Sequence, residues 1–297
     1  MESAREILKA VRRIELGTRR VVQSRLTGSY HSAFKGQGMA FEDVRPYVPG
    51  DDVRHIDWNV SARHPDVQGS ALFVRTFREE RELTVLLMVD VSGSASFGTR
   101  RRSKLRLQAE LAAMLAFSAL RNNDRVGLLR FSDRVEQWLP PRKGRSHGLR
   151  VIRDVVEGEA ESRRTCLRRA LETLNRVQRR RAVVFLCTDF MDEGWEDGLR
   201  AAASRHDVVA FRLYDPAEFV LPDLGLVHWA DLETGERRWV DLGNRRNRQL
   251  YAEASRRRGQ EVTRRLRQLD VDVVDLDTRE ELVTPLARFF EERRRRR

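Results

Sequence analysis

From residue 83 onward the chain alternates apolar strands with amphipathic helices, and this pattern restricts the fold more than any other feature of the sequence. The run TVLLMVD at residues 84–90 is continuously apolar, as in strands buried on both faces of a parallel sheet. The run AVVFLC at residues 182–187 has the same character. Such strands, separated by helices, predict an α/β fold in which helices cover both faces of a doubly wound, mostly parallel sheet of the Rossmann type.

The expected elements follow one another in a regular order. Strands are expected at 71–79, 84–90, 125–131, 134–139, 182–187, 207–213 and 271–276. Helices are expected at 104–120, 146–156, 167–179, 196–204, 245–269 and 279–293. Residues 215–242 interrupt the alternation and predict an extended insertion with a hairpin turn at Thr234 and Gly235.

The first part of the chain has a different character. Residues 3–26 are expected to form a helix, because Ser3 and Glu6 have the spacing of a capping box. Residues 28–69 are punctuated by Gly and Pro and are expected to form a long loop, a kind of segment that tends to be functional. We therefore expect an N-terminal segment at residues 1–79 and an α/β domain at residues 80–297.

Composition excludes several classes of protein. The two cysteines, Cys166 and Cys187, are too few for a disulfide scaffold and fit a reducing compartment. No apolar run approaches the roughly 18 residues that span a bilayer, and the N-terminus lacks the apolar core of a secretory signal, so a cytoplasmic location is expected. Five of the twelve net positive charges are arginines at 293–297, expected to be a disordered tail, and residues 100–102 are expected to be a solvated turn. Nucleic acid is therefore a less favoured partner than protein.

Oxygen-bearing side chains follow two of the predicted buried strands. Asp90, Ser92 and Ser94 come directly after the first, Asp189 follows a later one, and Thr165 opens a predicted helix. Ligands bind at the carboxyl ends of strands in open α/β sheets, and hard oxygen donors suit Mg²⁺. Taken one at a time, these residues equally fit turns and helix caps.

Together these five residues resemble the metal-ion-dependent adhesion site of von Willebrand factor A domains. The resemblance implies a divalent cation, usually Mg²⁺, with Mn²⁺ or Ca²⁺ as alternatives. It also implies hydroxyls that ligate directly, aspartates of which one or both act through water, and an open position that accepts a carboxylate from a partner protein. The family usually has Gly-Gly before the threonine, where this chain has Arg163 and Arg164.

A longer signature precedes the first buried strand. The segments GSYHSAFKGQGMAFEDVRPYVPGDDVRHIDWNVSAR and LFVRTFREERE, followed by DVSGSASFG, closely resemble the bacterial domain-of-unknown-function 58 family. DPAEFVLPDLG and DLETGE further along resemble the downstream pattern of that family. The resemblance implies a von Willebrand factor A-like domain and a MoxR-type AAA+ ATPase as partner.

Within the signature, charges of opposite sign alternate beside two large aromatic side chains. These residues are Arg45, Tyr47, Asp51, Asp52, Arg54, Asp57, Trp58 and Arg63. The favoured interpretation is a loop fixed by buried Asp–Arg ion pairs, with Trp58 packed against the core. The alternative is a recognition surface or a second metal site.

Motifs of common enzyme classes do not occur. Lys104 has the spacing of a phosphate-binding loop from Gly98, but Ser103 and Leu105 stand where that motif requires Gly and Ser or Thr. The serines have no Gly-x-Ser-x-Gly context, the six histidines have no paired-ligand spacing, and Cys166 has no evident base. We therefore expect no catalytic residues.

The expected function is a non-enzymatic, metal-dependent protein-binding module. It would serve a MoxR-type ATPase as an adaptor or co-chaperone in the assembly or maturation of an unknown client protein. One alternative is a metal-dependent phosphoesterase or nuclease in which Asp51, Asp52 and Asp57 act with the same cation. A second alternative is a structural module whose metal loop stays empty.

Overall fold

The structure is a computed structural model that describes residues 33–34, 39–63, 72–79, 82–98, 102–158 and 160–296. The chain divides into two compact units. The larger comprises residues 1–34 and 84–297, and the smaller comprises residues 35–83. The helix predicted at residues 3–26 lies outside the described residues.

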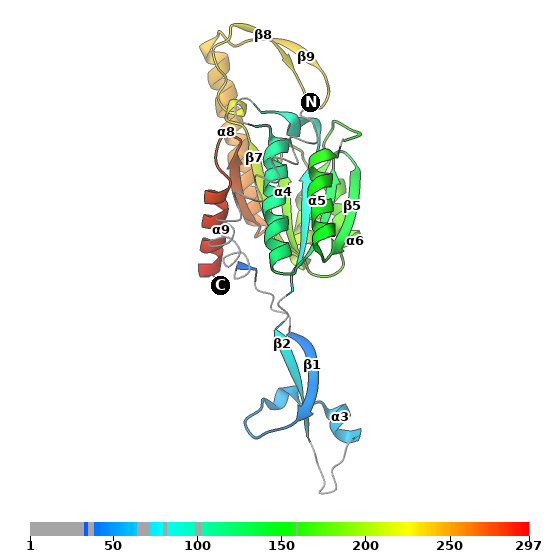
Figure 1. The fold of residues 1–297 in the computed structure, drawn as a ribbon. Helices are drawn as coiled ribbons and strands as arrows, with labels where there is room; N and C mark the ends of the chain where they lie inside the picture. Colours follow the sequence, from blue (N-terminus) through cyan, green and yellow to red (C-terminus); the bar gives the residue numbers. More distant parts are fainter. Residues whose placement is uncertain are drawn as a thin grey trace. The chain divides into compact units, whose positions relative to one another are not determined.

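A six-stranded sheet forms the centre of the larger unit (Figure 1). Its spatial order is β10 (Asp272–Asp277), β7 (Asp207–Tyr214), β6 (Val183–Thr188), β3 (Thr84–Asp90), β4 (Arg125–Phe131) and β5 (Val135–Arg142). Neighbours pair in parallel except β4 and β5, which form an antiparallel hairpin. Numbered along the chain within this sheet, the strands follow the doubly wound order 3-2-1-4-5-6. The α/β fold predicted from the alternation of apolar runs is confirmed.

Helices cover both faces of this sheet. They are α4 (Lys104–Arg121), α5 (Arg145–Glu157), α6 (Leu167–Val177), α7 (Glu196–Arg205), α8 (Arg245–Gln268) and α9 (Val283–Arg296). In Figure 1, α4 and α5 lie in front of the sheet. On one face, buried side chains of α6, α7 and α8 share a core cluster with residues of β3, β4, β6 and β7. Within the described ranges, none of the helices combines the length and apolar character of a membrane span.

The C-terminal helix anchors an N-terminal fragment in the larger unit. Phe34 is buried, and its ring lies 5.5 Å from that of Phe185 in β6 and 5.7 Å from that of Phe290 in α9. The expected segment at residues 1–79 is corrected here, because the burial of Phe34 places this part of it in the α/β unit.

The expected disordered tail is also corrected, because α9 continues to Arg296. Arg293 is buried, and its guanidinium pairs with Asp207 of β7 and Asp272 of β10. It also lies over the ring of Phe34, 4.6 Å from the centroid. The pattern of five consecutive arginines cannot show which of them faces the sheet.

Regular elements occupy much of the predicted loop at residues 28–69. In the smaller unit, β1 (Met39–Pro46) pairs antiparallel with β2 (Phe73–Glu79), which confirms the predicted strand at 71–79. The 3-10 helix η2 (Val53–His55) and the short helix α3 (Trp58–Arg63) lie between the strands in the sequence. For the described residues the loop prediction was wrong, because Pro46 ends β1 and Pro49 and Gly50 lie between β1 and η2 rather than inside either element.

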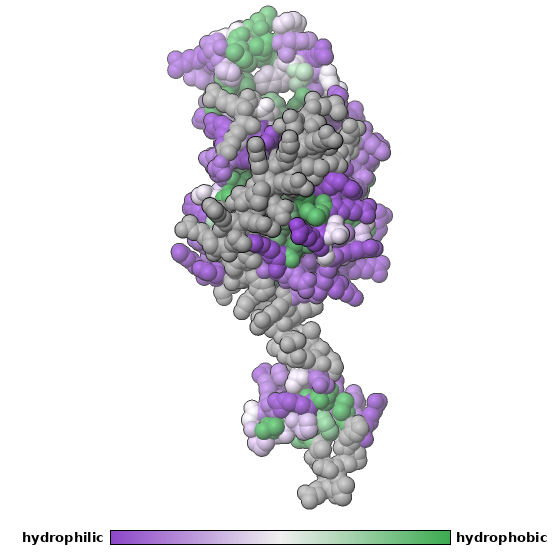
Figure 2. Space-filling view, in the orientation of Figure 1, coloured by the Kyte–Doolittle hydropathy of each residue, from purple (hydrophilic) through white to green (hydrophobic). Residues whose placement is uncertain are grey.

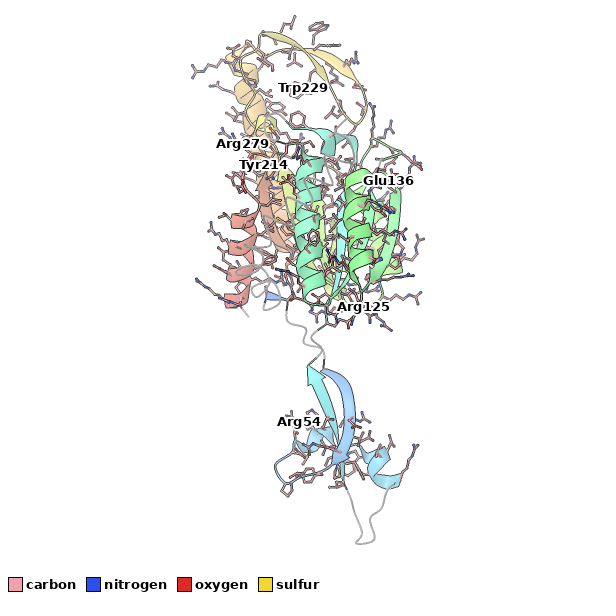
Figure 3. All side chains as sticks on the ribbon, viewed as in Figure 1. Arg54, Arg125, Glu136, Tyr214, Trp229 and Arg279 are labelled. Atoms are coloured by element: carbon pink, nitrogen blue, oxygen red, sulfur yellow. The ribbon has the colours of Figure 1, made fainter. Side chains whose placement is uncertain are left out.

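The predicted insertion follows β7. It contains a 3-10 helix, η4 (Pro216–Glu218), and an antiparallel hairpin of β8 (Leu226–Ala230) and β9 (Arg237–Asp241). The hairpin turn is confirmed at Thr234 and Gly235, where Gly235 has a φ of +74°. Trp229 of β8, labelled in Figure 3, lies 5.9 Å from Tyr251 of α8 between ring centroids.

Candidate metal centre

Asp90 ends β3 at the point where the sheet changes direction, since β3 lies between β4 and β6. Open α/β sheets bind their ligands at such a point. The carboxylate of Asp90 is 1% exposed and accepts hydrogen bonds from the Ser92 amide at 3.0 Å and the Thr188 hydroxyl at 2.6 Å. Burial, together with the charge of Asp189, raises the pKa of Asp90 to about 6. A nearby cation would therefore favour the ionised carboxylate.

The turn after β3 adds two hydroxyls to this carboxylate. The 3-10 helix η3 (Gly93–Ser96) follows the strand directly, and the hydroxyl oxygens of Ser92 and Ser94 lie 3.1 Å apart. Ser92 is buried and Ser94 is half-buried. The structure therefore brings the first three predicted ligands together within one turn.

Asp189 follows β6 and is engaged by a lysine. The Lys104 ammonium lies 2.8 Å from a carboxylate oxygen of Asp189 and 2.7 Å from one of Glu218 in η4. Lys104 is 2% exposed. Burial alone lowers the pKa of Lys104, but the charges of Asp189 and Glu218 outweigh it and raise this pKa above its usual value. Lys104 therefore neutralises much of the charge of Asp189.

Thr165 lies just before α6, whose N-cap is Cys166, and so precedes the helix that it was expected to open. The backbone next to it contacts the turn after β3, since the Gly93 amide donates to the Arg163 carbonyl at 2.7 Å. The Thr165 hydroxyl donates to a carboxylate oxygen of Glu233 at 2.7 Å. The structure thus brings Thr165 to the same edge of the sheet as Asp90, and adds Glu233.

These donors fit a small divalent cation. A carboxylate offers about four acceptor sites, and hydrogen bonds occupy two of those on Asp90. Hydroxyls of Ser92, Ser94 and Thr165 supply the neutral oxygens that Mg²⁺ accepts. In the described part of the chain, no three or more His, Cys, Asp and Glu side chains cluster as a metal site. The predicted set differs from such a cluster, because it contains only two carboxylates and its other ligands are hydroxyls.

The eight signature residues belong to the smaller unit. Asp51 accepts two hydrogen bonds of 2.7 Å from Arg45, and Asp52 pairs with Arg54 at 2.9 Å. The predicted Asp–Arg pairs are present at these positions. They are not buried, because the side chains of Arg45 and Arg54 are 45% and 85% exposed.

Asp57 is a buried carboxylate of this unit. It pairs with Arg75 of β2 at 2.7 Å and accepts the amide of Asn59 in the first turn of α3. The hydrogen bond from Arg75 lowers the pKa of Asp57. Trp58 is 67% exposed, so the prediction that it packs against the core was wrong. It starts the short helix that Asp57 caps, and that position turns its ring to solvent.

Tyr47 and Arg63 complete the signature set. Tyr47 is half-buried, and its amide donates to the carbonyl of Leu72 at 2.7 Å beyond the end of β1. Arg63 ends α3 and is exposed. The structure shows no convergence of these two side chains on the aspartates.

One arginine and one cysteine outside the predicted site have structural roles. Arg102 was expected in a solvated turn, but its side chain is 6% exposed. It bonds to Glu110 and to the carbonyls of Thr278 and Glu280, so it links the start of α4 to the segment after β10. Cys187 is fully buried in β6, and burial raises its thiol pKa, which agrees with a core role.

Sequence reasoning missed three residues of this edge: Lys104, Glu218 and Glu233. Lys104 is one of only four lysines beside 53 arginines, which sets it apart at the start of α4. Glu218 has a capping-box spacing from Asp215, and the structure shows both hydrogen bonds of that box. The role of Glu233 could not be predicted from a local sequence pattern, because its partner Thr165 is 68 residues away in the sequence.

Comparison with known proteins agrees with the signature. Residues 43–261 match the family described as "Protein of unknown function DUF58". The chain belongs to this family. An uncharacterised protein of Mycobacterium bovis is 32% identical over 296 residues, covering 98% of this chain and 90% of that protein. An uncharacterised protein of Mycobacterium tuberculosis H37Rv shows the same identity and coverage. Membership of this family therefore does not assign an activity to the chain.

The chain is also similar to solved structures at low sequence identity. The conserved hypothetical protein BatB from Bacteroides thetaiotaomicron is 16% identical with a TM-score of 0.44, covering 72% of this chain and 99% of that one. The SpRpn10 VWA domain is 13% identical with a TM-score of 0.37, covering 69% and 93%. The mussel byssus protein PTMP1, with a zinc-occupied MIDAS motif, is 14% identical with a TM-score of 0.35, covering 44% and 38%.

Proposed function

We propose that this protein is a protein-binding module that holds a divalent cation, Mg²⁺, at the carboxyl edge of its sheet. One observation carries the proposal. The buried carboxylate of Asp90 lies beside the paired hydroxyls of Ser92 and Ser94, and no basic side chain of the described residues pairs with it. A buried carboxylate without a basic partner calls for a cation or a proton.

The surrounding residues have distinct roles in this proposal. Asp90, Ser92 and Ser94 would hold the cation, and Thr165 would complete the set of hydroxyls. Asp189 would not bind the cation directly and would contribute its charge at longer range, because its carboxylate already pairs with Lys104. When bound, the cation supplies positive charge and an open coordination position to an acidic side chain of a partner.

The partner that we propose is a MoxR-type AAA+ ATPase, acting with this protein on an unknown client in a chaperone-like role. The resemblance to the family supports this choice. A non-enzymatic role is supported at Asp51, Asp52 and Asp57, since each of these carboxylates is bonded to an arginine. A cation at these carboxylates would have to compete with the arginine that each of them already bonds.

Mg²⁺ binding tests the first half of the proposal. Mg²⁺ at about 100 times its Kd should raise the free energy of unfolding of the wild type by about 2.7 kcal/mol. Asp90→Asn keeps the size of the side chain but removes the charge, so this stabilisation should be lost. Thermal unfolding with Mg²⁺ or EDTA measures the effect.

Asp197→Asn is the matched control, because Asp197 is exposed on α7. It should respond to Mg²⁺ like the wild type. Equal stabilisation of the Asp90→Asn variant would place the cation elsewhere, and no stabilisation of any protein would favour the structural module with an empty metal loop.

Capture from a lysate of the source organism tests the partner. A MoxR-type ATPase should be enriched by the wild type with Mg²⁺ and not by the wild type with EDTA or by Asp90→Asn. Enrichment in all three samples would show a contact that does not depend on the metal. Mg²⁺-dependent cleavage of a phosphoester by the purified chain alone would contradict the non-enzymatic role.

A further inference from the structure

The hairpin turn between β8 and β9 is held in a defined conformation. One carboxylate oxygen of Asp231 accepts the amides of Glu233 at 2.8 Å and Thr234 at 2.9 Å. The amide of Asp231 donates to the Glu236 carbonyl at 2.9 Å, and the amide of Gly235 donates to the Asp231 carbonyl, also at 2.9 Å. These bonds fix the backbone of the turn at Glu233.

The same turn lies against the loop that follows β3. A Cβ atom at Gly93 would collide with the carbonyl oxygen of Leu232, so the two backbones meet at a position that only glycine fits. Gly93 lies between the predicted ligands Ser92 and Ser94. The insertion therefore reaches the candidate metal centre even though the sequence places it far from that loop.

Glu233 brings a second carboxylate without a basic partner to this edge. Its side chain is half-buried and accepts the Thr165 hydroxyl at 2.7 Å. Among the described residues, no basic side chain pairs with it. Asp90 and Glu233 together carry two negative charges, which a divalent cation would balance, while Lys104 compensates Asp189.

We propose that Glu233 is an internal carboxylate that closes the metal centre. Its carboxylate would take the open coordination position of the cation, which the proposed function assigns to an acidic side chain of a partner. This inference rests on the proposed function, since it requires a cation held by Asp90. A partner that uses this position must displace the hairpin turn, so the insertion limits access to the metal.

The test is a calorimetric Mg²⁺ titration of the wild type, Glu233→Gln, Asp90→Asn and Glu236→Gln. Glutamine keeps the oxygen that accepts the Thr165 hydroxyl, so the turn stays docked while the charge is lost. Glu233→Gln should weaken Mg²⁺ binding by at least about tenfold, the scale of losing a supporting partner of a metal site. Glu236 is the matched control because it is exposed in the same turn and pairs with Arg238.

Amide hydrogen exchange gives a second readout. Mg²⁺ should slow the exchange of residues 231–236 in the wild type and in Glu236→Gln, and should leave it unchanged in Glu233→Gln. Equal Mg²⁺ affinity of Glu233→Gln and the wild type, with binding lost in Asp90→Asn, would overturn this inference and leave the proposed function intact. No Mg²⁺ binding by the wild type would overturn both.

Discussion

Lys104 carries a positive charge in an almost fully buried position at the start of α4. Ser103 caps this helix by accepting the Arg106 amide at 3.2 Å. The cap sets where the helix begins and so places Lys104 between Asp189 and Glu218. A buried charge is tolerated when it is paired and hydrogen-bonded, and two carboxylates meet that condition here.

Replacement of Lys104 should therefore be costly. Lys104→Met keeps the length of the side chain and leaves two carboxylates without their cation, so the free energy of unfolding should fall by about 3–5 kcal/mol. Urea unfolding at pH 7 measures this change. Lys143→Met, at an exposed position, is the control and should change stability by less than about 0.5 kcal/mol. A loss below about 1 kcal/mol for Lys104→Met would show that the carboxylates find other partners or stay protonated.

At the scale of elements, α9 closes the face of the sheet that carries Phe185 and Phe211. Phe289 lies 6.4 Å from Phe211 between ring centroids, and Phe290 lies close to Phe34. Arg293 adds the ion pairs to Asp207 and Asp272 at the amino ends of β7 and β10. The helix is thus fixed by aromatic packing together with one buried guanidinium.

The end of α9 offers a direct comparison of buried and exposed arginines. Arg293→Ala removes a buried guanidinium from Asp207 and Asp272 and should lower the free energy of unfolding by about 3 kcal/mol. Arg295→Ala, two residues away and exposed, should change it by less than about 0.5 kcal/mol. Similar values for the two variants, measured by chemical denaturation, would show that the Arg293 ion pairs do not stabilise the fold.

Exposed apolar side chains gather on the insertion. Leu224, Leu226 and Trp239 are 62%, 65% and 68% exposed. Figure 2 shows hydrophobic side chains at the end of the larger unit where β8 lies. The hairpin thus exposes apolar surface near the turn that carries Glu233.

At the scale of the whole molecule, the chain divides into two compact units. The larger unit holds the candidate metal centre, while the smaller unit holds the eight signature residues, among them Arg54, labelled in Figure 3. Asp57 links α3 to β2 in the smaller unit through its bond with Arg75. Since each unit has its own buried contacts, a change confined to one should leave the other folded.

Asp57→Ala tests this separation. Loss of the Arg75 pair and of the helix cap should increase proteolytic cleavage within residues 39–79 several-fold, while Mg²⁺ affinity of the larger unit stays that of the wild type. Limited proteolysis and Mg²⁺ titration measure the two effects. Asn59→Ala, exposed in α3, is the control. A parallel loss of Mg²⁺ affinity would instead favour the phosphoesterase or nuclease alternative, in which Asp57 acts with the cation.

Local patterns in the sequence determined the elements of the larger unit and one half of its candidate centre. Continuous apolar runs predicted β3 and β6, because strands buried on both faces exclude polar side chains. Asp90, Ser92 and Ser94 were predictable as a group, since they lie within five residues of one another. The hairpin turn at Gly235 was predictable for the same reason, because turn residues express a local backbone preference.

Only the tertiary structure decided which distant polar and charged side chains meet. Lys104 and Asp189 are 85 residues apart, and Thr165 and Glu233 are 68 apart. Arg293 reaches Asp207 across 86 residues. An arginine or glutamate has the same local pattern whether it is solvated or buried, so composition cannot distinguish the two. The physical difference is the loss of water around each charge, and that depends on which strand or helix the fold brings beside it.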